Sequence, residues 1–264
     1  YTVSVLVLEP SSGKTATAST SVTVSDPQDF YGDANTIYVN NVGDNDWSYV
    51  PAGVPEANKV NVDSFQKYLD TAQTPATWVT DPVWSSFQGG AAKRWRFKRG
   101  GVWEISIYLN SSDRPDVMFD DYGDPNEDPP VWSIFTNPQG GTLFNLRMGY
   151  GHGQVDGRTP QFNPPELRMQ NIRCIGRFDS VASPATDPNS ERSVSLWFIS
   201  ACELTMVDCS FDGFGGSVMN FQHGTGGDYS PIGKVHLDNC ALTNFGGQYP
   251  IIISNSATID SSVA

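Results

Sequence analysis

A short basic stretch is the part of this sequence best suited to bind a charged ligand. Lys93-Arg-Trp-Arg-Phe-Lys-Arg99 alternates basic and aromatic residues. Side chains of a β-strand point alternately to its two faces, so the pattern predicts a strand with Trp95 and Phe97 facing the core. The cations that alternate with them then face outward together, and they are Arg94, Arg96 and Lys98. A row of cations suits the carboxylates or sulfates of a polyanionic glycan, which makes these three residues candidate ligand-binding residues.

An acidic segment at residues 113–128 offers an alternative partner for these cations. Its carboxylates are Asp113, Asp116, Asp120, Asp121, Asp124, Glu127 and Asp128. If they pair with the basic row, that row is structural. The same oxygens suit Ca²⁺, which takes six to eight oxygen ligands, although EF-hand spacing is absent. A solvated acidic loop is the third interpretation. We expect no other cofactor and no metal site built on cysteine, because no Cys-x-x-Cys occurs and the three histidines are scattered.

A second group of polar residues lies at residues 217–222, which alternate as a strand. Met219 and Phe221 are expected to face the core, which leaves Asn220 and Gln222 outside as candidate ligand-binding residues. His223 follows and is the one candidate for a catalytic general base, with a solvated loop histidine as the alternative. This strand supplies neither of the two carboxylates that glycosidases need. We therefore expect that the chain alone does not cleave polysaccharides.

The elements that must position these residues are indicated by a repeat. Leu204-Thr-Met-Val-Asp-Cys-Ser-Phe-Asp-Gly-Phe-Gly-Gly216 recurs 31 residues later from Val235, and a looser copy begins at Leu167. Apolar residues alternate with polar ones, which indicates strands, and a fixed period of this length indicates stacked coils. One position holds Asn or Asp in each copy: Asn171, Asp208 and Asn239. Asn and Asp tolerate a left-handed backbone, so the repeat predicts a ladder of tight bends.

Cysteines also recur in the repeat. Cys209 and Cys240 occupy equivalent positions, where the first copy has the apolar Ile172. Residues at equivalent positions of neighbouring coils lie about one strand spacing apart, roughly 4.8 Å. We expect both cysteines, and Cys174 at a nearby inward position, to be buried and reduced thiols that pack as small apolar side chains.

Three further passages carry a resemblance to a known family. They are Thr36-Ile-Tyr-Val-Asn-Asn-Val-Gly-Asp44, Phe97-Lys-Arg-Gly-Gly-Val-Trp-Glu104, and Leu146-Arg-Met-Gly-Tyr-Gly-His-Gly153 with its continuation to Pro160. Together with the repeat they resemble right-handed parallel β-helix proteins of the pectin-lyase-like type. The resemblance implies an all-β fold of stacked coils with an N-terminal capping α-helix. It also implies a polysaccharide groove over the strand at residues 217–222.

The segment from Asn61 to Ala72 is where we expect the capping helix. Val62, Phe65, Tyr68 and Leu69 fall on one face at helical spacing. A β-helix needs its open end covered, because edge strands and core would otherwise face water. The sequence therefore predicts one α-helix in an otherwise all-β chain.

The beginning of the chain has a different character. Residues 1–26 alternate as two strands around a turn, and they resemble the last β-hairpin of a PKD-type or immunoglobulin-like sandwich domain. Residues 27–35 form the expected linker, and residues 36–264 the β-helix. Both ends are expected to be cut from a longer protein, so the β-helix should continue beyond residue 264.

Composition narrows the partners. The formal net charge is −13 and the pI about 4.4, which disfavours nucleic acid and anionic membrane surfaces. No apolar run reaches membrane-spanning length, so no membrane insertion is expected. We expect a secreted or cell-surface protein. Two functions are open: binding or processing of an extracellular polysaccharide, as a relative of lyases or epimerases, or a non-catalytic structural role as a stalk, adhesin or filament subunit that contacts neighbouring subunits.

Overall fold

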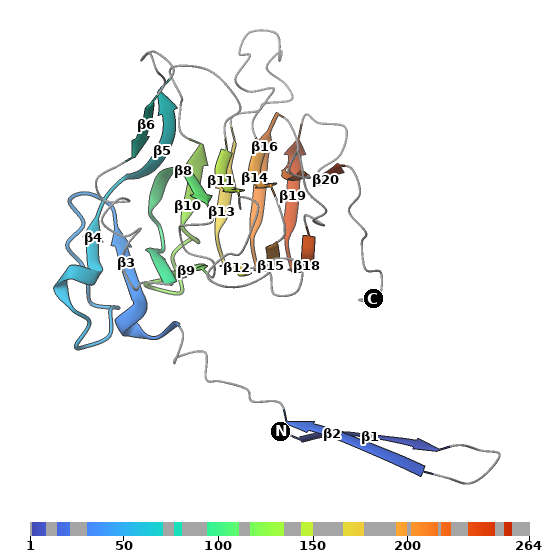
Figure 1. Cartoon of the computed structure of the whole chain (residues 1–264). Coiled ribbons are helices and arrows are strands. Elements are labelled where there is room, and N and C mark those ends of the chain that lie inside the picture. Colours follow the sequence, from blue (N-terminus) through green and yellow to red (C-terminus); the bar gives the residue numbers. More distant parts are fainter. Residues whose placement is uncertain are drawn as a thin grey trace.

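The protein is all-β, and most of its strands run parallel in two large sheets (Figure 1). The computed structural model describes residues 2–8, 15–21, 31–70, 77–80, 94–110, 117–134, 144–149, 166–176, 194–199, 202–215, 218–222, 232–245 and 251–254. Besides strands, these residues form two short 3₁₀ helices, η1 (Asp33–Asn35) and η2 (Glu56–Asn58). No helix in this part of the chain has the length and hydrophobicity to span a bilayer.

The seven-stranded sheet contains the basic stretch near one end. Its order is β18 (Ile232–Asp238), β15 (Cys202–Val207), β12 (Glu166–Gln170), β9 (Val117–Tyr122), β7 (Arg94–Lys98), β3 (Thr36–Asn40) and β4 (Lys59–Asn61). All its pairs are parallel. The basic stretch is therefore a strand held between β3 and β9, as the sequence predicts.

The eleven-stranded sheet has two parts that meet in one long strand. The order along its main path is β19 (Ala241–Phe245), β16 (Ser210–Phe214), β13 (Arg173–Ile175), β10 (Val131–Ile134), β8 (Val102–Asn110), β11 (Phe144–Gly149), β14 (Val194–Ile199), β17 (Met219–Gln222) and β20 (Ile251–Ser254). The first half of β8 pairs with β10, and its second half pairs with β11. The sheet therefore has two branches. One runs from the first half of β8 through β10 to β19, and the other runs from the second half of β8 through β11 to β20.

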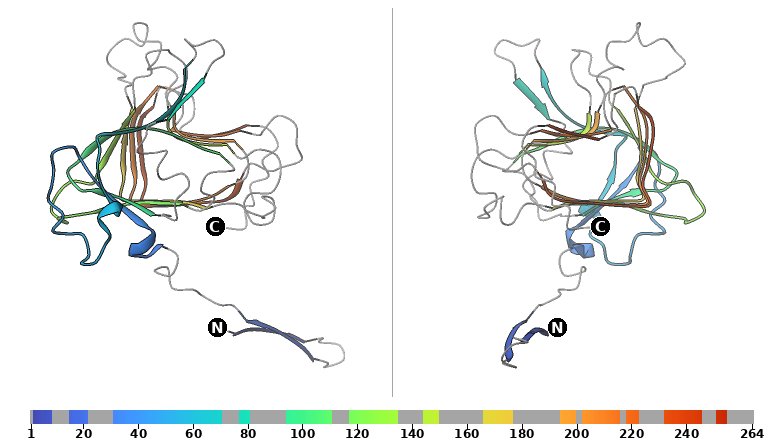
Figure 2. Two further views of the ribbon diagram at one scale, coloured as in Figure 1. Left: turned by 60° about the vertical axis from the view of Figure 1, so that its left-hand side comes forward. Right: turned by 90° about the vertical axis from the view of Figure 1, so that its right-hand side faces the viewer.

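Three successive strands form a repeating unit, which we call a rung. The clearest rungs are β12–β13–β14, β15–β16–β17 and β18–β19–β20, and each strand pairs in parallel with its equivalent in the next rung. Strands of successive rungs lie over one another in Figure 2. This stacking is compatible with a parallel β-helix.

Left-handed bends join the first two strands of each rung, as predicted. Asn171, Asp208 and Asn239 have φ of 54°, 53° and 50°. Asn239 donates from Nδ2 to Asp208 Oδ1 at 2.6 Å, which links two rungs. Asn171 donates instead to Asp121 Oδ2 at 2.8 Å, and Asp121 lies on β9 in the preceding rung. The ladder of bends is therefore confirmed, and Asp121 adds a side-chain contact to it from the preceding rung.

Large aromatic side chains fill the interior at the end of the stack that holds β7. Trp95, Phe97, Trp103, Phe119 and Trp132 are 0–1 % exposed. Phe97 packs edge-on against Trp103 and Trp132, with ring centroids 5.1 and 5.2 Å apart. Trp103 donates from Nε1 to the carbonyl of Val62 at 2.7 Å. The predicted inward orientation of Trp95 and Phe97 is confirmed.

The cysteines of the repeat are also placed as predicted. Cys209 is 1 % exposed, Cys174 is fully buried, and both are free thiols. Cys240 is a free thiol too, but it is half-buried. Cys240 lies between β18 and β19, and each of these is the end strand of its sheet. Among the described residues, only one neighbouring rung therefore covers Cys240.

The predicted capping α-helix is wrong. Its segment forms β4 and then β5 (Ser64–Asp70), a strand that pairs in parallel with β8 and antiparallel with β6 (Thr77–Thr80); residues 71–72 lie outside the described part. A short apolar pattern fits helix and strand alike, and its aromatic residues Phe65 and Tyr68 favour strands. Backbone pairing with β8 decides between the two.

The N-terminal segment forms a separate two-stranded antiparallel sheet. Its strands are β1 (Thr2–Leu8) and β2 (Thr15–Ser21), and the register runs from Thr2 opposite Ser21 to Leu8 opposite Thr15. The two predicted strands are therefore confirmed. Their assignment to a sandwich domain, and the boundaries at residues 26 and 36, stay predictions.

Candidate functional site

The predicted cationic row lies on the outer face of β7. Trp95 and Phe97 point into the core, so the alternation of the strand puts Arg94, Arg96 and Lys98 on the opposite face. These side chains are only 16, 25 and 11 % exposed. Their low exposure means that neighbouring carboxylates, more than water, surround the three charges.

The two arginines share one carboxylate on the neighbouring strand. Asp120 on β9 is 3 % exposed and accepts hydrogen bonds from both Nε and Nη2 of Arg94. Arg96 Nε forms an ion pair at 3.3 Å with Asp120 Oδ1 without hydrogen-bond alignment, and Arg96 Nη2 donates to the carbonyl of Asp121 at 2.5 Å. Burial lowers the pKa of Arg94, but Asp120 outweighs it and raises that pKa above its ordinary value. The predicted pairing with the acidic segment is confirmed for these two cations.

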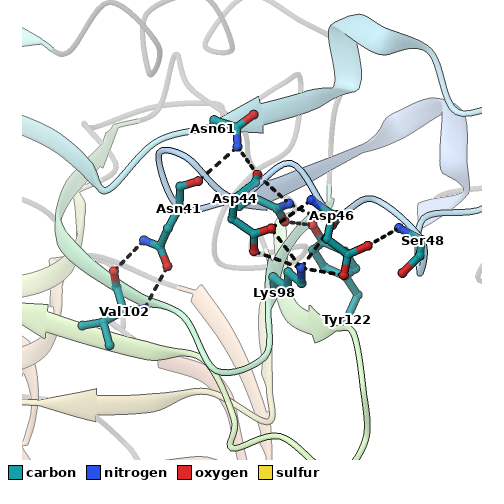
Figure 3. Close-up of polar contacts among 9 residues, drawn as sticks. Asn41, Asp44, Asp46, Ser48, Asn61, Lys98, Val102 and Tyr122 are labelled. Carbon is teal, nitrogen blue, oxygen red and sulfur yellow. Dashed lines mark hydrogen bonds and ion pairs between the residues drawn. The ribbon is translucent and has the colours of Figure 1, made fainter.

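Lys98 has different partners, which the sequence analysis did not anticipate. Its ammonium donates to Asp44 Oδ2 at 2.9 Å and to the carbonyl and Oδ2 of Asp46, both at 3.1 Å (Figure 3). Burial disfavours the charged lysine, but both carboxylates favour it, and the net effect raises the pKa of Lys98. Hydrogen bonds from Ser48, followed by Lys98, lower the pKa of Asp46 to about 2. Lys98 and Asp46 are therefore both ionised at neutral pH.

Amide side chains hold the loop that carries these two aspartates. Asn40 donates from Nδ2 to the carbonyls of Asp44 and Asp46 at 3.2 and 3.1 Å, and Asn61 donates to the carbonyl of Asp44 at 2.5 Å. Tyr122 donates to Asn40 Oδ1, and burial together with Asp44 and Asp46 raises its pKa. Figure 3 shows Asp44 and Asp46 meeting at Lys98, with Asn61 reaching the Asp44 backbone. The contacts fix the loop after β3 against β7 and β9.

This arrangement satisfies the cationic row from inside the protein. Three positive charges face Asp44, Asp46, Asp120 and the Asp121 carbonyl at contact distance. A polyanionic ligand would have to compete with these partners, which are held in place by the sheet. The role of the row as a glycan-binding site stays a prediction, and its geometry favours a structural role.

The acidic segment is engaged in the same way where it is described. Asp121 pairs with Arg99 at 2.6 Å, and Asp124 accepts hydrogen bonds from the backbone and side chain of Asn126. Within the described ranges, no three residues among His, Cys, Asp and Glu gather as a metal site. Asp113 and Asp116 lie outside those ranges, and the Ca²⁺ interpretation gains no support from the rest of the segment.

The second predicted group lies on the face formed by the second half of β8 with β11, β14, β17 and β20. Asn220 pairs in register with Trp197 and Ile252, and Gln222 pairs with Ile199 and Ser254. His223 lies outside the described residues. The same register continues from Trp197 to Arg147 on β11 and to Tyr108 on β8. Four adjacent strands therefore align one residue each in a row across the sheet: Tyr108, Arg147, Trp197 and Asn220.

Sequence reasoning missed Tyr108 and Arg147 because the members of the row come from rungs of unequal length. Residues 150–165 separate β11 from β12, whereas only residues 200 and 201 separate β14 from β15. The alternation within each strand was visible, but alignment between strands needs the backbone pairing. The Lys98 partners were missed for a similar reason, since Asp44 is 54 residues away in sequence.

Comparison with known proteins gives no match: no protein-family model fits the chain, and neither a curated protein nor a solved structure resembles it to a significant degree.

Proposed function

We propose that this chain is a secreted or cell-surface right-handed parallel β-helix protein of the pectin-lyase-like type, and that it binds an extracellular glycan without cleaving it. The observation that carries the proposal is the row Tyr108–Arg147–Trp197–Asn220, one residue from each of four adjacent parallel strands. Neighbouring members are spaced by the strand separation, about 4.8 Å. The row therefore runs along the stack, across the strands.

The residue types in the row suit a sugar chain that carries acidic groups. Aromatic rings offer flat apolar surfaces with a polar edge, Arg binds carboxylate or sulfate in a bidentate manner, and an amide both donates to and accepts from hydroxyl groups. At the preceding register position, Leu196 and Met219 are fully buried. Residues at alternate positions of a strand belong to opposite faces, so the row occupies the register position that alternates with these buried residues.

The absence of acidic residues from these strands argues against hydrolysis of a glycan at the row. Neither Asp nor Glu occurs in residues 107–110 or in β11, β14, β17 and β20. Hydrolysis of a glycosidic bond needs two carboxylates on opposite sides of that bond. The net charge of −13 opposes an anionic ligand at long range, so binding should be weak and should depend on contacts at the row.

A non-catalytic structural role is the second candidate function. The observation that favours it is the internal pairing of the cationic row, which leaves Arg94, Arg96 and Lys98 committed to protein carboxylates. On this alternative the rigid stack serves as a stalk, adhesin or filament subunit, and its partners are neighbouring subunits.

Affinity electrophoresis of the 264-residue chain through gels containing alginate, pectate or a glycosaminoglycan distinguishes the two functions. We expect retardation that weakens with salt and is lost in Arg147→Ala and Trp197→Ala. The matched control is Arg173→Ala, because Arg173 is an exposed arginine on a different face of the stack. Equal retardation of all three variants, or none for the unmodified chain, would refute glycan binding at the row and favour the structural role.

An assay for unsaturated uronate products and reducing ends on the same polymers tests the absence of cleavage. We expect no turnover. Turnover that survives purification and is lost in His223→Ala would instead identify His223 as a catalytic base.

A further inference from the structure

Two free thiols occupy equivalent places in neighbouring rungs. Cys209 and Cys240 each follow a left-handed bend, at Asp208 and Asn239. The backbones on both sides of the two cysteines are paired, since Asp208 N donates to the Asp238 carbonyl and Ala241 N donates to the Cys209 carbonyl, both at 3.0 Å. The two Cα atoms are therefore about one strand spacing apart, roughly 4.8 Å. Disulfides bridge Cα atoms separated by about 4.4–6.8 Å.

The two side chains have the same orientation. Cys209 Sγ lies 3.4 Å from the Val207 carbonyl, and Cys240 Sγ lies 3.4 Å from the Asp238 carbonyl, which is the same contact two residues back. Cys240 Sγ also lies 3.7 Å from the carbonyl of Met206, which belongs to the rung of Cys209. The Cys240 thiol thus reaches toward its neighbouring rung.

The thiols differ in access to solvent. Cys209 is 1 % exposed, whereas Cys240 is half-buried. In the 264-residue chain, a small reagent in solution therefore reaches Cys240 first, and Cys209 can act only as the second thiol.

We propose that Cys209 and Cys240 form a thiol–disulfide exchange site, which takes low-molecular-weight disulfides such as oxidised glutathione and closes a reversible bond between two rungs. The sulfur of Cys240 attacks the external disulfide, which releases one thiol and leaves a mixed disulfide. The sulfur of Cys209 then attacks the Cys240 sulfur of that mixed disulfide and releases the second thiol. Two protein thiols are oxidised, one external disulfide is reduced, and both protons leave with the released thiols. The proposed extracellular location would supply such an oxidant, but the chemistry itself does not depend on it.

The geometry also predicts how the bond behaves. Side chains stacked in register keep their Cβ atoms near the strand spacing, while a disulfide prefers roughly 3.5–4.5 Å, so the bond is strained and easily reduced. Burial raises the pKa of the Cys209 thiol to about 12 and also raises that of Cys240, so little thiolate is present at neutral pH. Exchange should therefore be slow and should accelerate in alkaline buffer.

The test is to incubate the 264-residue chain with oxidised glutathione, unfold it in denaturant, block remaining thiols with an alkylating agent, and measure the intact mass and peptide map. We expect the unmodified chain to lose two hydrogens, with a peptide that links Cys209 to Cys240 and disappears after dithiothreitol. In Cys209→Ser, the mixed disulfide should persist on Cys240. In the control Cys174→Ser, the linked peptide should form as in the unmodified chain.

Two results would overturn the proposal. One is a stable glutathione adduct on Cys240 in the unmodified chain, which would mean that Cys209 cannot reach it. The other is alkylation of both thiols after the oxidant. Because the oxidant is supplied in the tube and no glycan is present, failure here leaves the proposed glycan binding untouched.

Discussion

Removal of the Asp120 charge should be among the most destabilising single changes on the outer face of the protein. Asp120→Asn keeps the shape of the side chain but leaves the guanidinium groups of Arg94 and Arg96 without their shared carboxylate. Removing one partner of a buried ion pair costs about 3–5 kcal/mol. The two arginines keep 16 and 25 % exposure, and the asparagine oxygen can still accept one hydrogen bond. We therefore expect a loss at the lower end, about 3 kcal/mol.

Urea unfolding followed by tryptophan fluorescence measures this loss as a shift of the midpoint at constant slope. Glu56→Gln is the matched control, because Glu56 pairs with Lys59 at 3.1 Å but is 85 % exposed. An exposed pair of this kind contributes less than about 1 kcal/mol. If Asp120→Asn costs no more than this control, the reasoning that burial makes the Asp120 contacts important is wrong.

The same variant tests the cationic row as a ligand site. With Asp120 neutralised, Arg94 and Arg96 become available to an external carboxylate or sulfate. Stronger retardation of Asp120→Asn in polyanion gels would support the prediction that the row binds a glycan once it is released. Unchanged retardation would leave the row a structural feature.

Three further predictions concern stability. The pKa of Asp46 is lowered to about 2 and that of Lys98 is raised, so their contribution is complete between about pH 4 and 10. It is lost as pH falls toward about 2 or rises above the lysine pKa. In thermal melts across pH, Lys98→Met should remove the alkaline loss and only weaken the acid loss, because hydrogen bonds from Ser48 lower the pKa of Asp46 more than Lys98 does. Cys209→Asp buries a charge that lacks a partner and should lower the free energy of unfolding by several kcal/mol. Cys240→Asp, at the half-buried equivalent position, should cost clearly less. Similar unfolding midpoints for the two variants would contradict the difference in burial. Gly176→Ala places a Cβ 1.9 Å from a backbone oxygen of the next rung, so the rung must shift and the melting temperature should fall. A melting temperature equal to that of the unmodified chain would refute this close contact.

The strands and bends of the repeat could be predicted from sequence because their signals are local. Alternation along one strand needs only neighbouring residues, and the left-handed bends at Asn171, Asp208 and Asn239 follow from the side chains that tolerate positive φ. The orientation of Trp95 and Phe97 follows from the same alternation. None of these inferences requires knowledge of which strand lies beside which.

Predictions that depend on pairing between strands far apart in sequence were wrong or incomplete. The segment at residues 61–70 has an apolar pattern that a helix could use, and only its pairing with β8 makes it a strand. Lys98 meets Asp44 because β3 and β7 are neighbours in the sheet, although more than fifty residues separate them in sequence. Tyr108 and Arg147 entered the candidate site only when the register between strands was known.

Because the rungs stack in a single direction, the stability of the molecule builds up rung by rung along that direction. Each rung contacts only the rungs above and below it, so stability is a sum of rung terms and nearest-neighbour terms. Asp208 and Asn239 are separated by 31 residues and have the same backbone conformation. Removal of the 31 residues from Cys209 to Asn239 would join Asp208 directly to Cys240 and keep every remaining strand in register. A gene encoding this protein could therefore gain or lose whole rungs by recombination, and the length of the stack could change in evolution while its cross-section stays the same.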